Sequence, residues 1–207
     1  MRPIAFDIGN VLVNIDFRSF EKCWNDKGLN HHEHYMDFLL DLHGQQDVGL
    51  TTIRRHVKER FGEKLLKPFN QTLCDLDLAW DEIVVPDDVM IGFMNDLRDE
   101  GHPIALWSNI GKEHLELIKE KFPEILEGKI THMSCEVGVR KPTKLYYQSF
   151  FMDHPEFRDC VYLDDLAPNV LRAKEYGVKA IRFRLDNEIK RGTLLESLQA
   201  IRTLVKA

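Results

Sequence analysis

Four groups of polar residues in this 207-residue chain have types and positions suited to chemistry. Asp7 and the pair Asp164-Asp165 each follow an apolar run, where a carboxylate can attack an electrophile or bind Mg²⁺. Ser108-Asn109 follows another apolar run and precedes a predicted helix, whose free N–H groups favour a phosphate group. Lys141 stands before a proline that restricts the local backbone, so its ammonium can present a compact positive charge to an anion.

Each group also has a structural explanation that involves no ligand. Asp7 could cap a turn, Ser108-Asn109 could cap a helix, Arg140 and Lys141 could be solvated cations, and Asp164-Asp165 could cap the helix that follows. One shared binding site explains all four groups together more simply than four separate structural roles do. Asn169 could support that site by orienting a carboxylate or the lysine.

The apolar segments before these groups predict β-strands, and helical periodicity predicts helices between them. The predicted strands cover residues 4–6, 103–107, 129–133, 160–163 and 178–183, and the predicted helices cover 87–100, 112–122, 143–152, 168–176 and 193–205. Strands that alternate with helices indicate an α/β fold with a Rossmann-like parallel sheet and helices on both faces. Because ligands bind beyond the carboxyl ends of such strands, we expect three polar strand ends to meet in one crevice.

The stretch between the first two strands is too long for a simple crossover. It shows no convincing strand, and amphipathic helical patterns recur at 17–26, 33–42, 51–61 and 64–78. We therefore expect residues 17–86 to form a small helical cap domain, inserted into a catalytic core made of residues 1–16 and 87–207. The turn at residues 44–49 is our candidate for substrate selection, although it could be a plain connector between two helices.

The four groups, in this order along the chain, resemble the motifs of the haloacid-dehalogenase (HAD) superfamily of hydrolases. The motifs are the run from Phe6 to Val11, Ser108-Asn109, Lys141-Pro142 and Asp164-Asp165. The resemblance spans nearly the whole chain, and the helical insert matches the α-helical cap of that superfamily. The run from Phe6 to Phe17 looks like the branch that contains the bacterial α-D-glucose-1-phosphate phosphatases.

This resemblance implies a Mg²⁺-dependent phosphatase that hydrolyses a small phosphate monoester, most simply a sugar phosphate. Asp7 would attack phosphorus and form an aspartyl-phosphate. The resemblance also implies that Asp7, the Gly9 carbonyl and Asp165 hold Mg²⁺, with Asp164 close by. Such a reaction depends mainly on positioning and on charge neutralisation.

The same resemblance implies that Ser108, the backbone N–H of Asn109 and Lys141 bind the phosphoryl group. The chain departs from the commonest HAD phosphatase pattern at Gly9, where a second aspartate usually acts as general acid and base. Loss of a general acid could cost ~10²–10⁴-fold with a poor leaving group. The glucose-1-phosphatase branch shares this glycine. Our hypothesis is that Asp16 or a cap residue supplies the proton, although Asp16 could equally cap the helix that follows it.

Bulk properties limit the other possibilities. The net charge of −6 argues against non-specific nucleic-acid binding, and no apolar run approaches the ~20 residues of a membrane span. Four scattered cysteines and the lack of a signal peptide favour a cytoplasmic protein. The alternatives are a catalytically weak HAD-like scaffold that acts through interaction, a haloacid dehalogenase, which attacks carbon without Mg²⁺, and a phosphomutase. Neither the particular ester nor the oligomeric state follows from the sequence.

Overall fold

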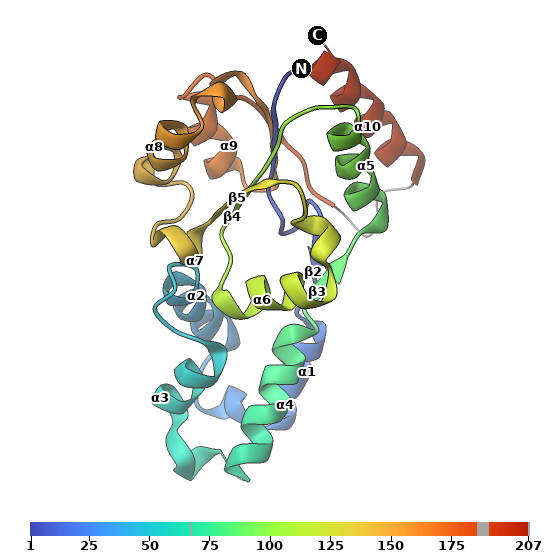
Figure 1. Ribbon diagram of the computed structural model, residues 1–207. Helices are drawn as coiled ribbons and strands as arrows, with labels where there is room; N and C mark the ends of the chain where they lie inside the picture. Colours follow the sequence, from blue (N-terminus) through green and yellow to red (C-terminus); the bar gives the residue numbers. More distant parts are fainter. Residues whose placement is uncertain (67, 186–190, 207) are drawn as a thin grey trace.

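The core of the protein is a parallel five-stranded sheet, seen in a computed structural model that describes residues 1–66, 68–185 and 191–206 (Figure 1). Its strands, in the spatial order β5-β4-β1-β6-β7, are β5 (Ile130–Met133), β4 (Ile104–Ser108), β1 (Ile4–Phe6), β6 (Val161–Asp164) and β7 (Lys179–Arg182). The strands pair in parallel throughout. This confirms the predicted α/β class and places β1 at the centre.

Helices cover both faces of this sheet, as the sequence predicted. On one face Ile4 and Phe6 join the core of α5 (Asp88–Asp99), α6 (Lys112–Lys121) and α10 (Arg191–Lys206). On the other face Ala5 packs with α8 (Lys144–Asp153) and α9 (Ala167–Lys174). The alternation along β1 follows from the two-residue repeat of a strand, and burial on both faces explains why all three residues are apolar.

The insert after β1 consists mainly of four helices, which lie together at the lower end of Figure 1. They are α1 (Arg18–Asp26), α2 (Tyr35–Gln46), α3 (Ile53–Leu65) and α4 (Phe69–Asp81). An aromatic cluster holds them: the ring centroids of Trp24 and Phe38 are 4.4 Å apart, and those of Phe20 and Trp80 are 5.0 Å apart. No helix among residues 1–66, 68–185 and 191–206 is long and apolar enough to cross a membrane.

A short antiparallel ribbon forms the entrance and exit of the insert. It pairs β2 (Val13–Ile15) with β3 (Val84–Pro86). The expectation that residues 17–86 contain no strand was therefore wrong for β3. The strand has three residues, too few for an alternating pattern to emerge, and its partner lies about seventy positions earlier in the chain. The ribbon joins the helical insert to the core at two adjacent points.

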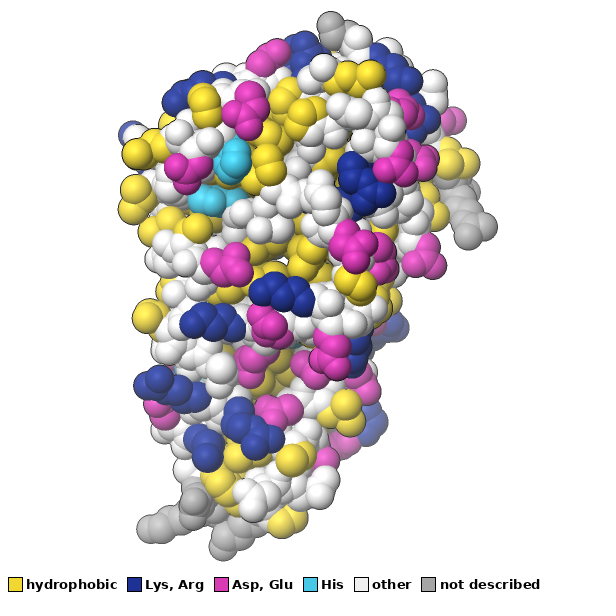
Figure 2. Space-filling view, in the orientation of Figure 1, with side chains coloured by type: hydrophobic (Ala, Val, Ile, Leu, Met, Phe, Trp, Pro, Cys, Tyr) yellow, Lys and Arg dark blue, Asp and Glu magenta, His cyan; other side chains and the backbone are white. Residues whose placement is uncertain are grey.

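The charged surface of the insert is mixed in sign. Figure 2 shows Lys and Arg side chains beside Asp and Glu side chains over its visible face. Arg54 Nε lies 2.7 Å from Asp77 Oδ2, and Arg60 Nε lies 2.8 Å from Glu33 Oε2. On this face the described residues form no continuous basic patch.

Candidate active site

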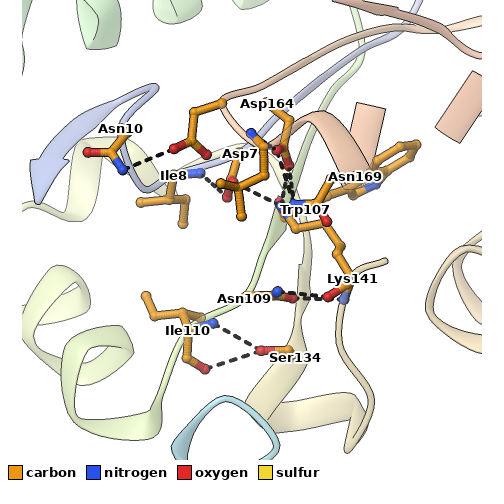
Figure 3. Close-up of polar contacts among 12 residues, drawn as sticks. Asp7, Ile8, Asn10, Trp107, Asn109, Ile110, Ser134, Lys141, Asp164 and Asn169 are labelled. Atoms are coloured by element: carbon orange, nitrogen blue, oxygen red, sulfur yellow. Dashed lines mark hydrogen bonds and ion pairs between the residues drawn. The ribbon is translucent and has the colours of Figure 1, made fainter. Parts of the chain in front are cut away.

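Three buried carboxylates meet where the central strands end. Asp7 follows β1 directly, and its N–H donates to the Leu163 carbonyl at 2.9 Å, which fixes it against β6. Asp164 ends β6 and Asp165 follows it. Each of the three aspartates offers one oxygen, and these oxygens lie within 4.8 Å of one another. Asp7 and Asp164 are labelled in Figure 3. The predicted convergence of strand ends thus places three acidic groups at one point.

Lys141 contacts two of these carboxylates, Asp7 and Asp164. Its Nζ is 3.0 Å from Asp7 Oδ2 and 2.8 Å from Asp164 Oδ2, and it donates to the Trp107 carbonyl at 2.6 Å. The side chain is 0% exposed. A buried ammonium is stable only when it is paired and hydrogen-bonded, and these contacts meet that requirement.

Asn109 holds the loop that carries Lys141. The Asn109 amide donates to the Lys141 carbonyl at 3.0 Å and accepts from the Lys141 N–H at 2.8 Å. Because these two hydrogen bonds occupy the Asn109 side chain, its backbone N–H is the part of Asn109 suited to a ligand. The next residue, Ile110, is fixed by its N–H, which donates to Ser134 Oγ at 2.9 Å. The loop after β4 is therefore rigidly tied both to Lys141 and to the end of β5.

Asp164 is surrounded by donors. Besides Lys141, its oxygens accept from the Tyr162 hydroxyl, from Asn169 Nδ2 at 3.0 Å and from the Leu166 N–H at 2.8 Å. Burial alone would raise the pKa of Asp164, but Lys141 and the hydrogen bonds hold that pKa below its ordinary value. Asp164 is therefore an anion whose lone pairs are used to orient Lys141. Asn169 has the supporting position that its spacing suggested.

Asp165 has far fewer donors. Asn10 Nδ2 donates to Asp165 Oδ2 at 3.1 Å, and in the described part of the chain this is the one hydrogen bond to its carboxylate. Burial raises the pKa of Asp165. A carboxylate that is buried, poorly supplied with donors and close to two others is suited to a cation. Asp165 is thus better placed than Asp164 to bind a metal directly.

Asp7 is the most perturbed group of the cluster. Burial raises its pKa to about 8, against the effect of Lys141 and with the help of Asp164 and Asp165. Three carboxylates face one contacting ammonium, so ionisation of all three would leave an excess of negative charge in a buried site. An all-oxygen donor set with this excess fits Mg²⁺, which prefers one or two carboxylates together with other oxygens. The residues present therefore fit the predicted metal.

A cavity of ≈ 110 Å³ lies between the insert and the core, and it is lined by Ile8 and Gly9, which follow Asp7 in the chain, but not by the four charged residues of the cluster. Gly9, Ser108 and Asn109 line it from the core, and His43 and Asp47 line it from α2 and the turn after it. The structure thus brings three of the predicted site residues to one hollow. It also brings the turn at residues 44–49 to that hollow.

Asp16 has different surroundings. It follows β2, and its carboxylate accepts from the Arg18 N–H at 3.1 Å and from Arg18 Nε at 2.8 Å. Hydrogen bonds from Arg18 lower the pKa of Asp16 to about 2. Such a group carries no proton near neutral pH, so these contacts argue against Asp16 as a proton donor. Its catalytic role remains an untested prediction.

Two groups of site residues were missed by sequence reasoning. Tyr162 lies inside an apolar strand, and nothing in the sequence indicates that its hydroxyl contacts Lys141 Nζ at 3.1 Å. Glu113 accepts from Gln46 Nε2 at 2.6 Å and from the Ile53 N–H at 2.9 Å, which joins α6 to the insert. Both contacts depend on how distant elements pack, and no local pattern reveals them.

Comparisons with known proteins agree with this architecture. No protein-family model matches the chain. A HAD-family enzyme from Bacteroides thetaiotaomicron matches with a TM-score of 0.75 and 22% identity, over 91% of this chain and 96% of that chain. The same enzyme in complex with magnesium and inorganic phosphate matches with a TM-score of 0.73 and 20% identity, over 92% and 98%. A predicted HAD-like family hydrolase from Porphyromonas gingivalis matches with a TM-score of 0.66 and 20% identity, over 94% and 97%. Identities this low establish the fold alone, and the fold of this chain is that of the HAD-family hydrolases.

Proposed function

We propose that this protein is a Mg²⁺-dependent phosphatase that hydrolyses a small phosphate monoester through an aspartyl-phosphate on Asp7. The observation that carries the proposal is the contact of Lys141 with both Asp7 and Asp164, beside a third carboxylate, Asp165. This arrangement offers a nucleophile, a positive charge for the phosphoryl group and a set of metal ligands in one place. The magnesium and phosphate bound by the related Bacteroides enzyme are the ligands this arrangement suits.

The contacts of the three aspartates support one assignment of the metal ligands. We propose that Asp7, Asp165 and the Gly9 carbonyl hold Mg²⁺, while Asp164 stays bound to Lys141 and its other donors. Mg²⁺ bound there would neutralise charge on the phosphoryl oxygens and on the carboxylates. In this proposal Asp165 binds the metal and Asp164 orients Lys141.

The chain's own groups then perform the transfer. The Asp7 carboxylate attacks phosphorus, the ester P–O bond breaks, and the leaving oxygen takes a proton. Lys141, Ser108 and the Asn109 N–H hold the phosphoryl oxygens during this step. Water then attacks the phosphorus of the aspartyl-phosphate, releases inorganic phosphate and restores Asp7. Positioning and charge neutralisation supply most of the rate in such reactions.

A small polar ester is the proposed substrate. The cavity of ≈ 110 Å³ has three polar side chains of the insert, His43, Gln46 and Asp47, among walls that are mainly apolar. We propose a sugar phosphate because of the resemblance to the glucose-1-phosphatase branch, and the three polar side chains could contact its hydroxyl groups. We also propose that residues 17–86 are the cap domain and that residues 1–16 and 87–207 are the catalytic core.

A haloacid dehalogenase would use the same attack by Asp7, but on carbon. One matching structure is described as a dehalogenase, with a TM-score of 0.58 and 15% identity. That chemistry has no need of the poorly supplied carboxylate of Asp165, and the metal-suited donor set therefore favours the phosphatase.

An aryl phosphate assay tests the proposal. We expect turnover that requires Mg²⁺, and a loss of at least ~10³-fold in kcat for Asp7→Asn. The control is Asp37→Asn, because Asp37 is a well-exposed carboxylate on α2. Full turnover by Asp7→Asn would remove the nucleophile assignment. No turnover of any phosphate ester by the wild-type protein would favour the scaffold alternative, and turnover of a haloacid alone would favour the dehalogenase.

A further inference from the structure

The cavity lined by Gly9, Ser108 and Asn109 contains few groups that could exchange a proton with a substrate. Among the described residues that line it, three are titratable: His43, Asp47 and His114. Gly9 lines the same cavity and has no side chain. The proposed reaction needs a proton for the leaving oxygen, and Gly9 cannot provide it. One of the three titratable groups is therefore the natural candidate.

The two histidines are poorly suited to donate a proton. Burial lowers the pKa of His43 to about 4 and the pKa of His114 to about 4. Both rings are therefore neutral near neutral pH. His114 is also engaged through Nε2, which lies 3.0 Å from the Trp80 carbonyl. A neutral imidazole is a very weak acid, so neither ring matches the task.

Asp47 has the properties that the histidines lack. It directly follows α2, is 8% exposed, and burial raises its pKa to about 6, against the effects of Arg140 and Lys141. Arg140 Nη1 lies 3.1 Å from Asp47 Oδ2, while His43 Nδ1 lies 4.0 Å from Oδ1. In the described part of the chain no hydrogen bond reaches Oδ1. Arg140 thus holds Asp47 Oδ2, and Asp47 Oδ1 is available to exchange a proton with a substrate.

The position of Asp47 is fixed by the core. Arg140 precedes Lys141 in the chain, and its Nη1 also donates to the His43 carbonyl at 3.2 Å. The neighbouring Gln46 donates to Glu113 of α6 at 2.6 Å. Asp47 is therefore anchored on both sides to core residues, one of which adjoins the proposed phosphate-binding lysine. These contacts hold Asp47 in the cavity that Gly9, Ser108 and Asn109 also line.

We propose that Asp47 is the general acid and base of the reaction, in place of the side chain that Gly9 lacks. The inference rests on the proposed phosphatase function. As the ester P–O bond breaks, the Asp47 carboxyl proton moves to the leaving oxygen and an alcohol departs. The Asp47 carboxylate then takes a proton from the water that attacks the aspartyl-phosphate. The sum is ester plus water giving alcohol plus inorganic phosphate, with both carboxyl groups restored.

Two esters of similar shape but different leaving groups test this role. Phenyl phosphate releases a stable phenolate, whereas benzyl phosphate releases a poor alkoxide that needs a proton. We expect Asp47→Asn to lower kcat/KM for benzyl phosphate by ~10²–10⁴-fold and for phenyl phosphate by less than ~10-fold. The ratio kcat/KM reports the first transfer, which is where the leaving group departs. Asp37→Asn, on the helix that precedes Asp47, should alter neither value.

The outcomes separate this inference from the function on which it rests. Equal losses on the two esters for Asp47→Asn would overturn the acid role and assign Asp47 to structure or substrate binding, while the phosphatase function would stand. No loss on either ester would overturn it as well. A wild-type protein that cleaves neither ester would contradict the proposed function itself. Circular dichroism and urea unfolding of each variant would show whether a loss reflects misfolding.

Discussion

Adjacent aspartates in this site have very different surroundings. The Asp164 carboxylate accepts from Lys141, Tyr162, Asn169 and a backbone N–H, whereas the Asp165 carboxylate accepts from Asn10. Because side chains alternate in direction along a strand end, neighbours in sequence face different partners. The difference fits the separate roles that we propose for the two residues, with Asp164 orienting Lys141 and Asp165 binding Mg²⁺.

Substitution of each aspartate should separate these roles. Asp165→Asn should abolish the rise in melting temperature that Mg²⁺ gives the wild-type protein, because a cation stabilises only a fold that binds it. Asp164→Asn should keep a rise with Mg²⁺ but lower the free energy of unfolding by ~3–5 kcal/mol, because Lys141 loses a buried partner. Thermal unfolding with and without MgCl₂ measures both. The reverse pattern would exchange the two assignments.

Asp16 gives a second prediction at this scale. Its carboxylate is paired with Arg18, and that pairing lowers its pKa to about 2. We expect Asp16→Asn to change kcat/KM by less than ~3-fold on both benzyl and phenyl phosphate, since an anion at neutral pH has no proton to give. A large loss confined to benzyl phosphate would restore Asp16 as the proton donor and remove Asp47 from that role.

Residue-level prediction from the sequence succeeded where strand ends carry the chemistry. Asp7 and the Asp164-Asp165 pair were expected to meet because parallel strands deliver their carboxyl ends to one edge. Asp47 and Tyr162 could not be found in that way. The first is placed by the docking of the cap on the core, and the second by the order of strands in the sheet. Neither relation has a local signature.

At the scale of elements, the turn after α2 docks tightly on the core. Gly49 has φ of +76°, and a Cβ there would lie 2.8 Å from the Cys135 carbonyl oxygen. Across the same interface, a Cβ at Gly111 would lie 2.4 Å from Gln46 Cγ. The turn can therefore lie this close to the core only because Gly49 and Gly111 have no side chains. The contacts of Arg140 with Asp47 and of Glu113 with Gln46 hold the turn and the core together. This interface holds Asp47 in place.

A pair of alanine variants tests the importance of that approach. Gly49→Ala adds a clash to an unfavourable left-handed backbone, whereas Gly28→Ala, with φ of +70°, meets only His31 at 3.8 Å. Gly28→Ala should lower the free energy of unfolding by ~1–2 kcal/mol through its backbone conformation alone, and Gly49→Ala should lower it by more because of the added clash. Only Gly49→Ala should also lower kcat/KM for benzyl phosphate, by ~10-fold or more, because the acid is displaced. Equal kinetic effects in the two variants would contradict a role for this contact.

Prediction of elements from the sequence was good for the core strands and the longer helices and failed for the ribbon of β2 and β3. The five core strands and the four helices of the insert follow from apolar runs and helical periodicity. The three-residue strand β1 is an uninterrupted apolar run, whereas the equally short β2 and β3 show no clear pattern, and their pairing is non-local. The proposed domain boundaries coincide with this ribbon, where the chain leaves and re-enters the core.

At the scale of the whole molecule, burial of histidines between insert and core links stability to pH. The His114 pKa is lowered from 6.5 to about 4, chiefly by burial. As pH falls through 6.5, His114 takes up a proton in the unfolded chain but not yet in the folded protein. The stability that the neutral, buried His114 ring contributes is therefore complete above about pH 6.5 and is lost toward pH 4. Asp47 acts in the opposite direction, because its pKa is raised in the folded state.

The contribution of His114 can be isolated by substitution. His114→Gln keeps a donor for the Trp80 carbonyl but does not titrate. Between pH 7.5 and pH 4, the wild-type protein should lose about 3 kcal/mol more unfolding free energy than this variant, because one pKa unit corresponds to ~1.4 kcal/mol. Urea unfolding at both pH values gives the difference. Parallel pH dependence in the two proteins would show that His114 does not titrate as its burial indicates.

The covalent intermediate on Asp7 is the central claim, and it can be observed directly. The wild-type protein with Mg²⁺ is mixed rapidly with phenyl phosphate, quenched in acid, digested and examined by peptide mass spectrometry. We predict one added phosphoryl group on the peptide that contains Asp7, removed by hydroxylamine because acyl phosphates react with it. Asp7→Asn should show no such group. A phosphoryl group on another residue, or steady turnover by Asp7→Asn, would contradict the account.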